Sequence, residues 1–223
     1  MIALGFDASL RTCGVAVWRD GQVLARESAA MDRGQAERLM PMITEVMSAA
    51  GIEFANLDRI GVGCGPGSFT GVRVGLAAAR GLALVTGCPV VGISTTEALA
   101  AAVHEMEAAR ADGIIAAVDS KRGDLFVQKF TPHGDQLSDI VALAPENVRA
   151  WAGHGRILAV GDGVSMLRAS WPDAIASSAG DSCDPAVIAR LAAGRAPQEG
   201  GPAPIYIRPP DVTMGAGRGA SVF

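Results

Sequence analysis

The sequence predicts an α/β protein of two lobes, in which each lobe is a mixed β-sheet flanked by helices. Two observations predict this class. A strand that ends at an aspartate, followed by a turn and two further strands, occurs at residues 2–28 and again at residues 114–143. Between these repeats, apolar strands alternate with helical segments. We therefore expect lobes at residues 1–110 and 111–208, followed by a disordered tail at residues 209–223.

The first repeat begins with a buried strand at residues 2–6 and continues with strands at residues 14–18 and 22–28. The dipeptide Asp20-Gly21 is typical of a two-residue hairpin turn. Asp7 ends the first strand, and the simplest interpretation is that its carboxylate accepts hydrogen bonds from backbone N–H groups of the turn. The second repeat places Asp119 at the equivalent position.

Residues 35–50 show helical periodicity over four turns, and Gly51 is a natural end for this helix. The apolar positions are 36, 39, 40, 43, 46, 47 and 50. Two interpretations are open. The segment is an amphipathic helix of the core, or it is half of a surface on which other helices dock.

The most distinctive stretch, at residues 65–75, reads GPGSFTGVRVG and stands between a strand at residues 60–64 and an apolar helix at residues 72–85. Ser68 or Thr70 can cap this helix. The stretch lacks the lysine of a P-loop and the spacing of the dinucleotide-binding motif. From the residues alone, a tight turn with a closely packed helix is favoured, and an anion site is the alternative.

Small residues recur every four positions along this helix, which predicts a ridge that another helix backbone can approach closely. They are Gly71, Gly75, Ala79 and Ala83. Beyond it we expect a strand at residues 89–93 and a helix from the capping box at Ser94 to about Arg110. In the second lobe, a short helix from Pro185 ends at Gly194.

The composition argues against several classes of protein. Hydrophobic residues make up 49% of the 223 and the net charge is −4, so a basic nucleic-acid-binding face is not expected. The four cysteines contain no C-x-x-C pair, which favours reduced thiols and a cytoplasmic location. We expect no membrane span, because no apolar run is long enough. The three histidines are not spaced as metal ligands, so we expect no metal site.

The stretch at residues 65–75 resembles the signature of the bacterial TsaB (YeaZ) family of threonylcarbamoyladenosine biosynthesis proteins. These are non-catalytic relatives of the TsaD transferase. The resemblance extends to both strand–Asp repeats and to the closing segment at residues 205–208. It implies a two-lobed fold of the actin-like ATPase superfamily, which is related to ribonuclease H. Two departures from the family pattern are Gly34-Gln35, where many relatives carry a histidine, and the turn at residues 8–12, which lacks glycine.

The resemblance implies a partner subunit with no catalytic residues of its own. It would scaffold TsaD, which transfers the threonylcarbamoyl group to the adenosine next to the anticodon of tRNAs that read ANN codons. TsaE and tRNA would join through this complex, and the chain alone could form a homodimer. ATP or ADP with magnesium would enter only at the level of the complex. The implied partner interface consists of Ala36, Met40, Ile43, Met47, Gly71, Gly75 and Ala79.

An enzymatic alternative stays open. In active members of the superfamily, the aspartate and the turn after it approach phosphate and magnesium, so a small kinase or phosphohydrolase could use Asp7 and Asp119. A nuclease of the ribonuclease-H type is a third interpretation, although its further carboxylates are not evident. Candidate nucleotide or anion contacts are Asp7, Ser9, Ser68, Thr70 and Arg73.

Overall fold

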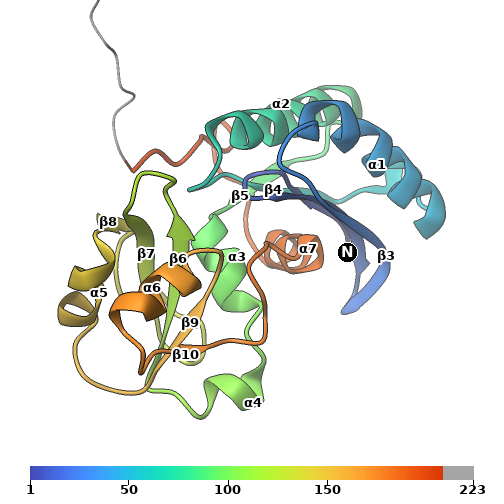
Figure 1. The fold of residues 1–223 in the computed structure, drawn as a ribbon. Coiled ribbons are helices and arrows are strands. Elements are labelled where there is room, and N and C mark those ends of the chain that lie inside the picture. Colours follow the sequence, from blue (N-terminus) through green and yellow to red (C-terminus); the bar gives the residue numbers. More distant parts are fainter. Residues whose placement is uncertain (208–223) are drawn as a thin grey trace, which may run out of the picture.

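The computed structural model describes residues 1–207 and contains two five-stranded mixed sheets, each flanked by helices (Figure 1). The predicted α/β architecture of two lobes is confirmed. The strand order is β3-β2-β1-β4-β5 in the first sheet and β10-β9-β6-β7-β8 in the second. The disordered tail predicted at residues 209–223 lies outside the described residues.

The first sheet combines an antiparallel meander with two parallel strands. β1 pairs antiparallel with β2, β2 pairs antiparallel with β3, and β4 and β5 continue the sheet in parallel. The predicted hairpin turn is present, since Asp20 and Gly21 both have positive φ angles, 47° and 93°. The strands are β1 (Ile2–Asp7), β2 (Thr12–Arg19), β3 (Gln22–Ala30), β4 (Arg59–Gly63) and β5 (Val90–Ile93).

Two helices cover one face of this sheet and a third covers the other (Figure 1). α1 (Gln35–Ala50) and α2 (Phe69–Thr86) lie side by side on the outer face, with η1 (Phe54–Asn56) between them in sequence. Their buried side chains form an aliphatic core with the sheet. α7 (Pro185–Ala193) packs on the opposite face, between the two lobes.

The second sheet repeats the arrangement of the first. β6 pairs antiparallel with β7 and parallel with β9, as β1 does with β2 and β4. The strands are β6 (Gly113–Asp119), β7 (Leu125–Phe130), β8 (Val141–Leu143), β9 (Ile157–Val160) and β10 (Ile175–Ala176). Its helices are α3 (Thr95–Ala101), α4 (Glu105–Ala108), α5 (Pro145–Ala152) and α6 (Val164–Ser170).

Two details differ from the sequence prediction. The helix expected to run to about Arg110 is broken into α3 and α4, because His104 starts a new helix by accepting a hydrogen bond from the N–H of Met106 at 3.2 Å. The prediction also places α7 in the second lobe, whereas it packs against the first sheet. Gly5 and Gly61 make this possible, because a Cβ atom at either position would clash with α7.

Candidate functional site

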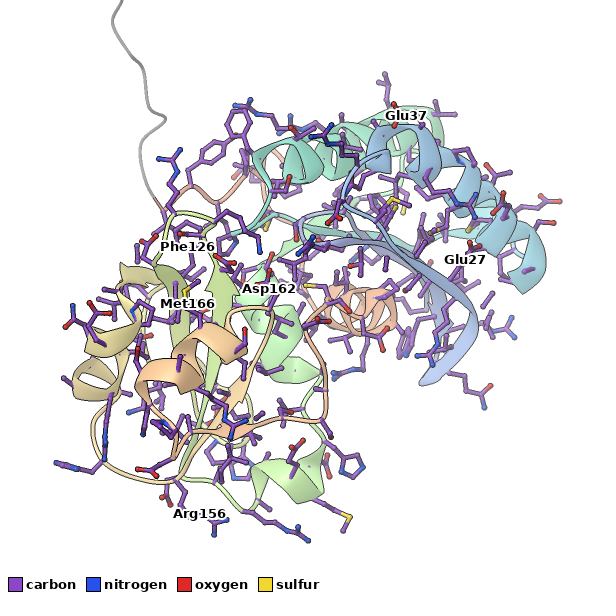
Figure 2. The ribbon with its side chains drawn as sticks, in the orientation of Figure 1. Glu27, Glu37, Phe126, Arg156, Asp162 and Met166 are labelled. Carbon is purple, nitrogen blue, oxygen red and sulfur yellow. The ribbon has the colours of Figure 1, made fainter. Side chains whose placement is uncertain are left out.

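A cavity of about 640 Å³ lies between the two lobes. The first lobe contributes the turn after β1 and the glycine-rich turn before α2. The second lobe contributes the turn after β6, Phe126 and Asp162, and Figure 2 shows both labelled side chains where the lobes meet. Residues 205–207 close one side. The cavity therefore collects the ends of the strands that the repeats predicted to be equivalent.

The glycine-rich turn packs directly on the turn after β1. The N–H of Ser68 donates to the carbonyl of Ser9 at 2.6 Å, and the Ser68 hydroxyl caps α2 by accepting from the N–H of Gly71 at 3.2 Å. A Cβ atom at Gly67 would clash with the carbonyl of Ser9, and one at Gly71 with the carbonyl of Ala8. The interpretation as a tight turn with a closely packed helix is confirmed, and Ser68 rather than Thr70 is the cap.

Asp7 is buried behind this turn and does not line the cavity. Its Oδ2 accepts hydrogen bonds from the N–H and the hydroxyl of Ser9, at 2.9 and 3.0 Å, while Oδ1 is buried without a partner in the described structure. Burial raises the pKa of the Asp7 carboxyl, and the bonds from Ser9 only partly oppose this. The predicted contact between Asp7 and a nucleotide is therefore not supported. Asp7 instead accepts hydrogen bonds from Ser9 within the turn that follows β1.

The equivalent aspartate of the second lobe is part of an ion cluster. Lys121 Nζ lies 3.0 Å from Asp119 Oδ2 and 3.1 Å from Asp162 Oδ2. Partial burial opposes both charges, but these bonds lower the pKa of Asp119 and raise that of Lys121. The sequence predicts Lys121 as a solvated turn charge. Its side chain is 56% exposed in the turn after β6, and the ion pairs with the two carboxylates were not predicted. From the sequence, Asp162 between Gly161 and Gly163 is predicted to lie in an ordinary strand-to-helix turn. It does lie between β9, the parallel neighbour of β6, and α6, but its contact with Lys121 was not predicted.

An aromatic cluster stands beside the glycine-rich turn. The guanidinium carbon of Arg73 lies 3.4 Å from the ring centroid of Phe69, and Arg73 Nε donates to the hydroxyl of Tyr206 at 3.0 Å. The two rings are 5.8 Å apart and about half exposed. Of the predicted nucleotide or anion contacts, Ser9, Ser68 and Arg73 line the cavity, and Thr70 does not. Phe69 and Tyr206 were not in the predicted set.

The predicted helix interface needs a correction. Ile43, Met47 and Ala79 are buried in the core of the first lobe. Gly71 and Gly75 are also buried, and a Cβ atom at Gly75 would lie 3.3 Å from Val62. The small residues therefore let α2 approach its own sheet rather than a partner. Only Ala36 and Met40 of the predicted set are exposed.

A different stripe of α2 is exposed to solvent. It contains Ala77, Gly81, Leu84 and Val85, and the last two are 87% and 86% exposed. By length and composition α2 is apolar enough to span a membrane, yet 28% of it is buried against the first lobe. The remaining apolar surface faces away from the sheet. Five of the seven residues predicted for a partner interface are therefore buried, and the exposed apolar stripe of α2 consists of other residues.

Among residues 1–207, no group of three or more metal-ligating side chains is placed to hold an ion. The four cysteines are reduced and buried. Burial raises the pKa of Cys64 to about 12 and that of Cys13 to about 11, so these thiols are not activated nucleophiles.

Known proteins resemble this chain over most of its length. The family model described as "TsaD: tRNA N6-adenosine threonylcarbamoyltransferase" matches residues 23–167. The Escherichia coli (strain K12) tRNA threonylcarbamoyladenosine biosynthesis protein TsaB is 31% identical over 181 residues, which is 78% of this chain and 74% of that protein. The Haemophilus influenzae protein of the same name is 36% identical over 123 residues, 55% of this chain and 51% of that one.

A crystal structure from Pseudomonas aeruginosa, described as an uncharacterized protein with similarity to peptidase YeaZ, superposes with a TM-score of 0.80 at 26% identity. The match covers 93% of this chain and 99% of that one. The actin-like architecture and the signature at residues 65–75 agree with these matches. The chain therefore belongs to the TsaB (YeaZ) family within the wider TsaD family.

Proposed function

We propose that this chain acts in the synthesis of threonylcarbamoyladenosine in tRNA, as a cytoplasmic accessory subunit that scaffolds TsaD. In this proposal TsaD performs the transfer to the adenosine next to the anticodon of ANN-reading tRNAs. One observation carries the proposal beyond the family name. The outer side of the α1–α2 pair presents apolar side chains that nothing in the described chain covers.

The chemistry of this face suits another helical surface. We define the docking face as the exposed residues Met40, Ala77, Gly81, Leu84 and Val85. Its α2 members follow one another at helical spacing, so they form a single stripe. Gly81 has no atom within 4 Å of where a Cβ would stand, so a partner backbone can approach there. Full burial of a leucine or valine side chain contributes roughly 1.5–3 kcal/mol.

We propose TsaD as the main occupant of the docking face and a second copy of this chain as its substitute when TsaD is absent. TsaE and tRNA would then contact the assembled pair. The net charge of −4 supports indirect contact with tRNA, because binding to nucleic acid is dominated by neutralisation of phosphates. Any ATP or ADP with magnesium belongs, in this proposal, to the complex.

The alternative of a small kinase or phosphohydrolase has less support. Such an enzyme would need Asp7 and Asp119 to face magnesium and phosphate. Asp7 is buried and Asp119 is bonded to Lys121. The nuclease alternative requires further carboxylates beside Asp7, and the described residues hold no metal-binding group there.

Substitution of the docking face tests the proposal. Leu84→Glu introduces a charge at the most exposed apolar side chain of the face, while glutamate keeps a good helix propensity. We expect association with TsaD of the same organism to weaken by about tenfold or more, because an unpaired charge would be buried. Leu137→Glu is the matched control, since Leu137 is also exposed, at 54%, but lies in the second lobe. Sedimentation velocity of each variant mixed with TsaD measures the association. Wild-type affinity of a folded Leu84→Glu protein would refute the docking face.

A further inference from the structure

The two lobes are joined at the start of α3, where neighbouring residues bind opposite lobes. The N–H of Thr95 donates to the carbonyl of Gly65 in the first lobe at 2.8 Å. The Thr95 hydroxyl lies 3.1 Å from the hydroxyl of Ser9, in the turn after β1. The hydroxyl of Thr96 donates to Oε1 of Gln128, on β7 of the second lobe, at 2.6 Å. The first turn of α3 is therefore bonded to both lobes at once.

The polar groups at this junction are shielded from water, and their hydrogen bonds run in one direction. Ser9, Thr95 and Thr96 are each 0% exposed. The Ser9 hydroxyl donates its single proton to Asp7 Oδ2 at 3.0 Å, so the Thr95 hydroxyl is the donor to Ser9. Rotation of one lobe against the other would break this chain between Ser9 and Thr95. A buried polar group that loses its partner is costly, so the chain opposes such a rotation.

A single apolar core continues through the contact between the lobes. It contains side chains of β5 and α7 from the first lobe and of α3, β6 and β7 from the second. Members that are at most 1% exposed include Val91, Ile93, Ile188, Leu99, Ile114 and Phe130. Lobes of one chain usually move relative to each other, unless a large hydrophobic interface holds them together. The shared core supplies such an interface here.

Two arginines of the first lobe also hold the two ends of α3, which lies against α7 (Figure 1). Arg195 donates two hydrogen bonds to the carboxylate of Glu97, and its Nη1 also donates to the carbonyl of Gly92 on β5 at 3.4 Å. Arg190 of α7 donates to the carbonyl of Ala101 at 3.0 Å. Helix α3 packs on the second sheet, so these bonds join the lobes along the length of the helix.

The chain leaves little room for a hinge where it first crosses between the lobes. β5 ends at Ile93 and α3 begins at Thr95, so Ser94 alone separates them. The Ser94 hydroxyl caps α3 by accepting from the N–H of Glu97 at 3.1 Å. At the second crossing, Cys183 Sγ lies 3.8 Å from the carbonyl of Thr95. A hinge needs a few residues that can absorb large changes of backbone angle, and the residues at this crossing have fixed partners instead.

We propose that the start of α3 is a lock between the lobes, and that the two sheets move as one rigid body. The lock consists of Ser9, Thr95, Thr96 and Gln128, with the shared apolar core behind it. The cavity between the lobes then keeps a fixed width, and the second lobe keeps a fixed angle to α1 and α2. The inference does not depend on docking of TsaD, since every contact that carries it lies within this chain.

Native-state hydrogen exchange tests the lock in the unmodified protein. The Thr95 amide is the probe, because its bond to Gly65 joins the lobes. Val62 on β4 and Ile115 on β6 are the references, since each is buried on an inner strand of one sheet. Exchange followed by NMR at increasing urea measures how often each amide opens.

We expect all three amides to open only with global unfolding, with the same urea dependence and protection factors equal to within about threefold. This is the result for lobes that separate only when the whole molecule unfolds. A Thr95 amide that opens about tenfold more often than both references, with a weaker urea dependence, would show that the lobes separate while each stays folded. That result would overturn the proposal.

A pair of variants tests the hydrogen-bond chain itself. Thr95→Val removes the hydroxyl that bonds to Ser9 and nearly keeps the shape of the side chain. We expect protection at position 95 to fall about tenfold or more, because the buried Ser9 hydroxyl loses its donor. Thr131→Val is the matched control and should leave position 95 unchanged, since the Thr131 hydroxyl bonds only His133 and Asp135 within one turn of the second lobe.

The references also show how the lock acts, because their protection reports the fold of each sheet. A larger loss at position 95 than at Val62 and Ile115 means that the hydroxyl chain holds the lobes together. An equal loss at all three positions means that the chain stabilises a molecule that still unfolds as one unit, and both results support the proposal. Wild-type protection at position 95 in Thr95→Val would overturn the assignment of the lock to this chain.

Discussion

At the scale of single residues, two glycines of α2 have opposite surroundings. Gly71 faces the backbone of Ala8, and a Cβ atom there would clash with its carbonyl oxygen. Gly81 has open space around it. We expect Gly71→Ala to destabilise the protein by about 1–3 kcal/mol through overpacking. Gly81→Ala, the matched control, should stabilise it by roughly 0.5–1 kcal/mol, because alanine restricts the unfolded chain. Urea unfolding of both variants measures the difference, and equal effects would contradict the close packing of the turns.

Asp7 gives a second test at this scale. Burial raises its pKa in the folded protein above the ordinary value of 3.8 for an aspartate. The folded state therefore binds the proton more tightly, so stability declines as the pH rises from below 3.8 through the folded pKa. Asp7→Asn keeps an acceptor for Ser9 and removes the charge. We expect it to be more stable than the wild type at pH 7, by about 1–3 kcal/mol, with the difference vanishing at acidic pH. Lower stability of the variant at pH 7 would contradict this account.

At the scale of elements, Lys121 joins the turn after β6 to the turn after β9. We expect Lys121→Met to lower the melting temperature, because Asp119 and Asp162 would face each other without a cation. In the wild type the lowered pKa of Asp119 contributes stability above its unfolded pKa, and this is lost as the pH falls through the folded pKa. The variant should therefore lose less stability on acidification. Thermal unfolding of the wild type and of Lys121→Met from pH 7 to pH 3 tests both points. Identical melting temperatures for the two proteins at every pH would show that the ion cluster does not stabilise the fold.

The bounds of several elements could be predicted from the sequence, whereas the face that each element presents could not. The helix predicted at residues 35–50 is α1, with the same bounds. The small residues of α2 predicted a close approach, which is present, but spacing does not distinguish approach to its own turn from approach to a partner helix. That distinction depends on the carbonyls of Ala8 and Ser9, which only the folded chain brings near.

At the scale of the whole molecule, the duplicated strand–Asp pattern was sufficient to predict two lobes. The cavity between them was not predictable, because its walls combine residues that are distant in sequence. Arg73 and Tyr206 are 133 positions apart, and Lys121 and Asp162 are 41 apart. Helix α7 returns to the first sheet for a related reason, since Gly5 and Gly61 accommodate it without any local pattern.

We propose above all that this chain is an accessory subunit of TsaD and does not itself transfer the threonylcarbamoyl group. Reconstituted transfer of labelled threonylcarbamoyl to a tRNA that reads ANN codons tests it most directly. We expect incorporation to require both TsaD and this chain, in the presence of TsaE and a source of threonylcarbamoyl-adenylate. Leu84→Glu should reduce incorporation about tenfold or more when both subunits are dilute, and Leu137→Glu should not. Incorporation by this chain without TsaD, or by TsaD equally well without this chain, would contradict the account.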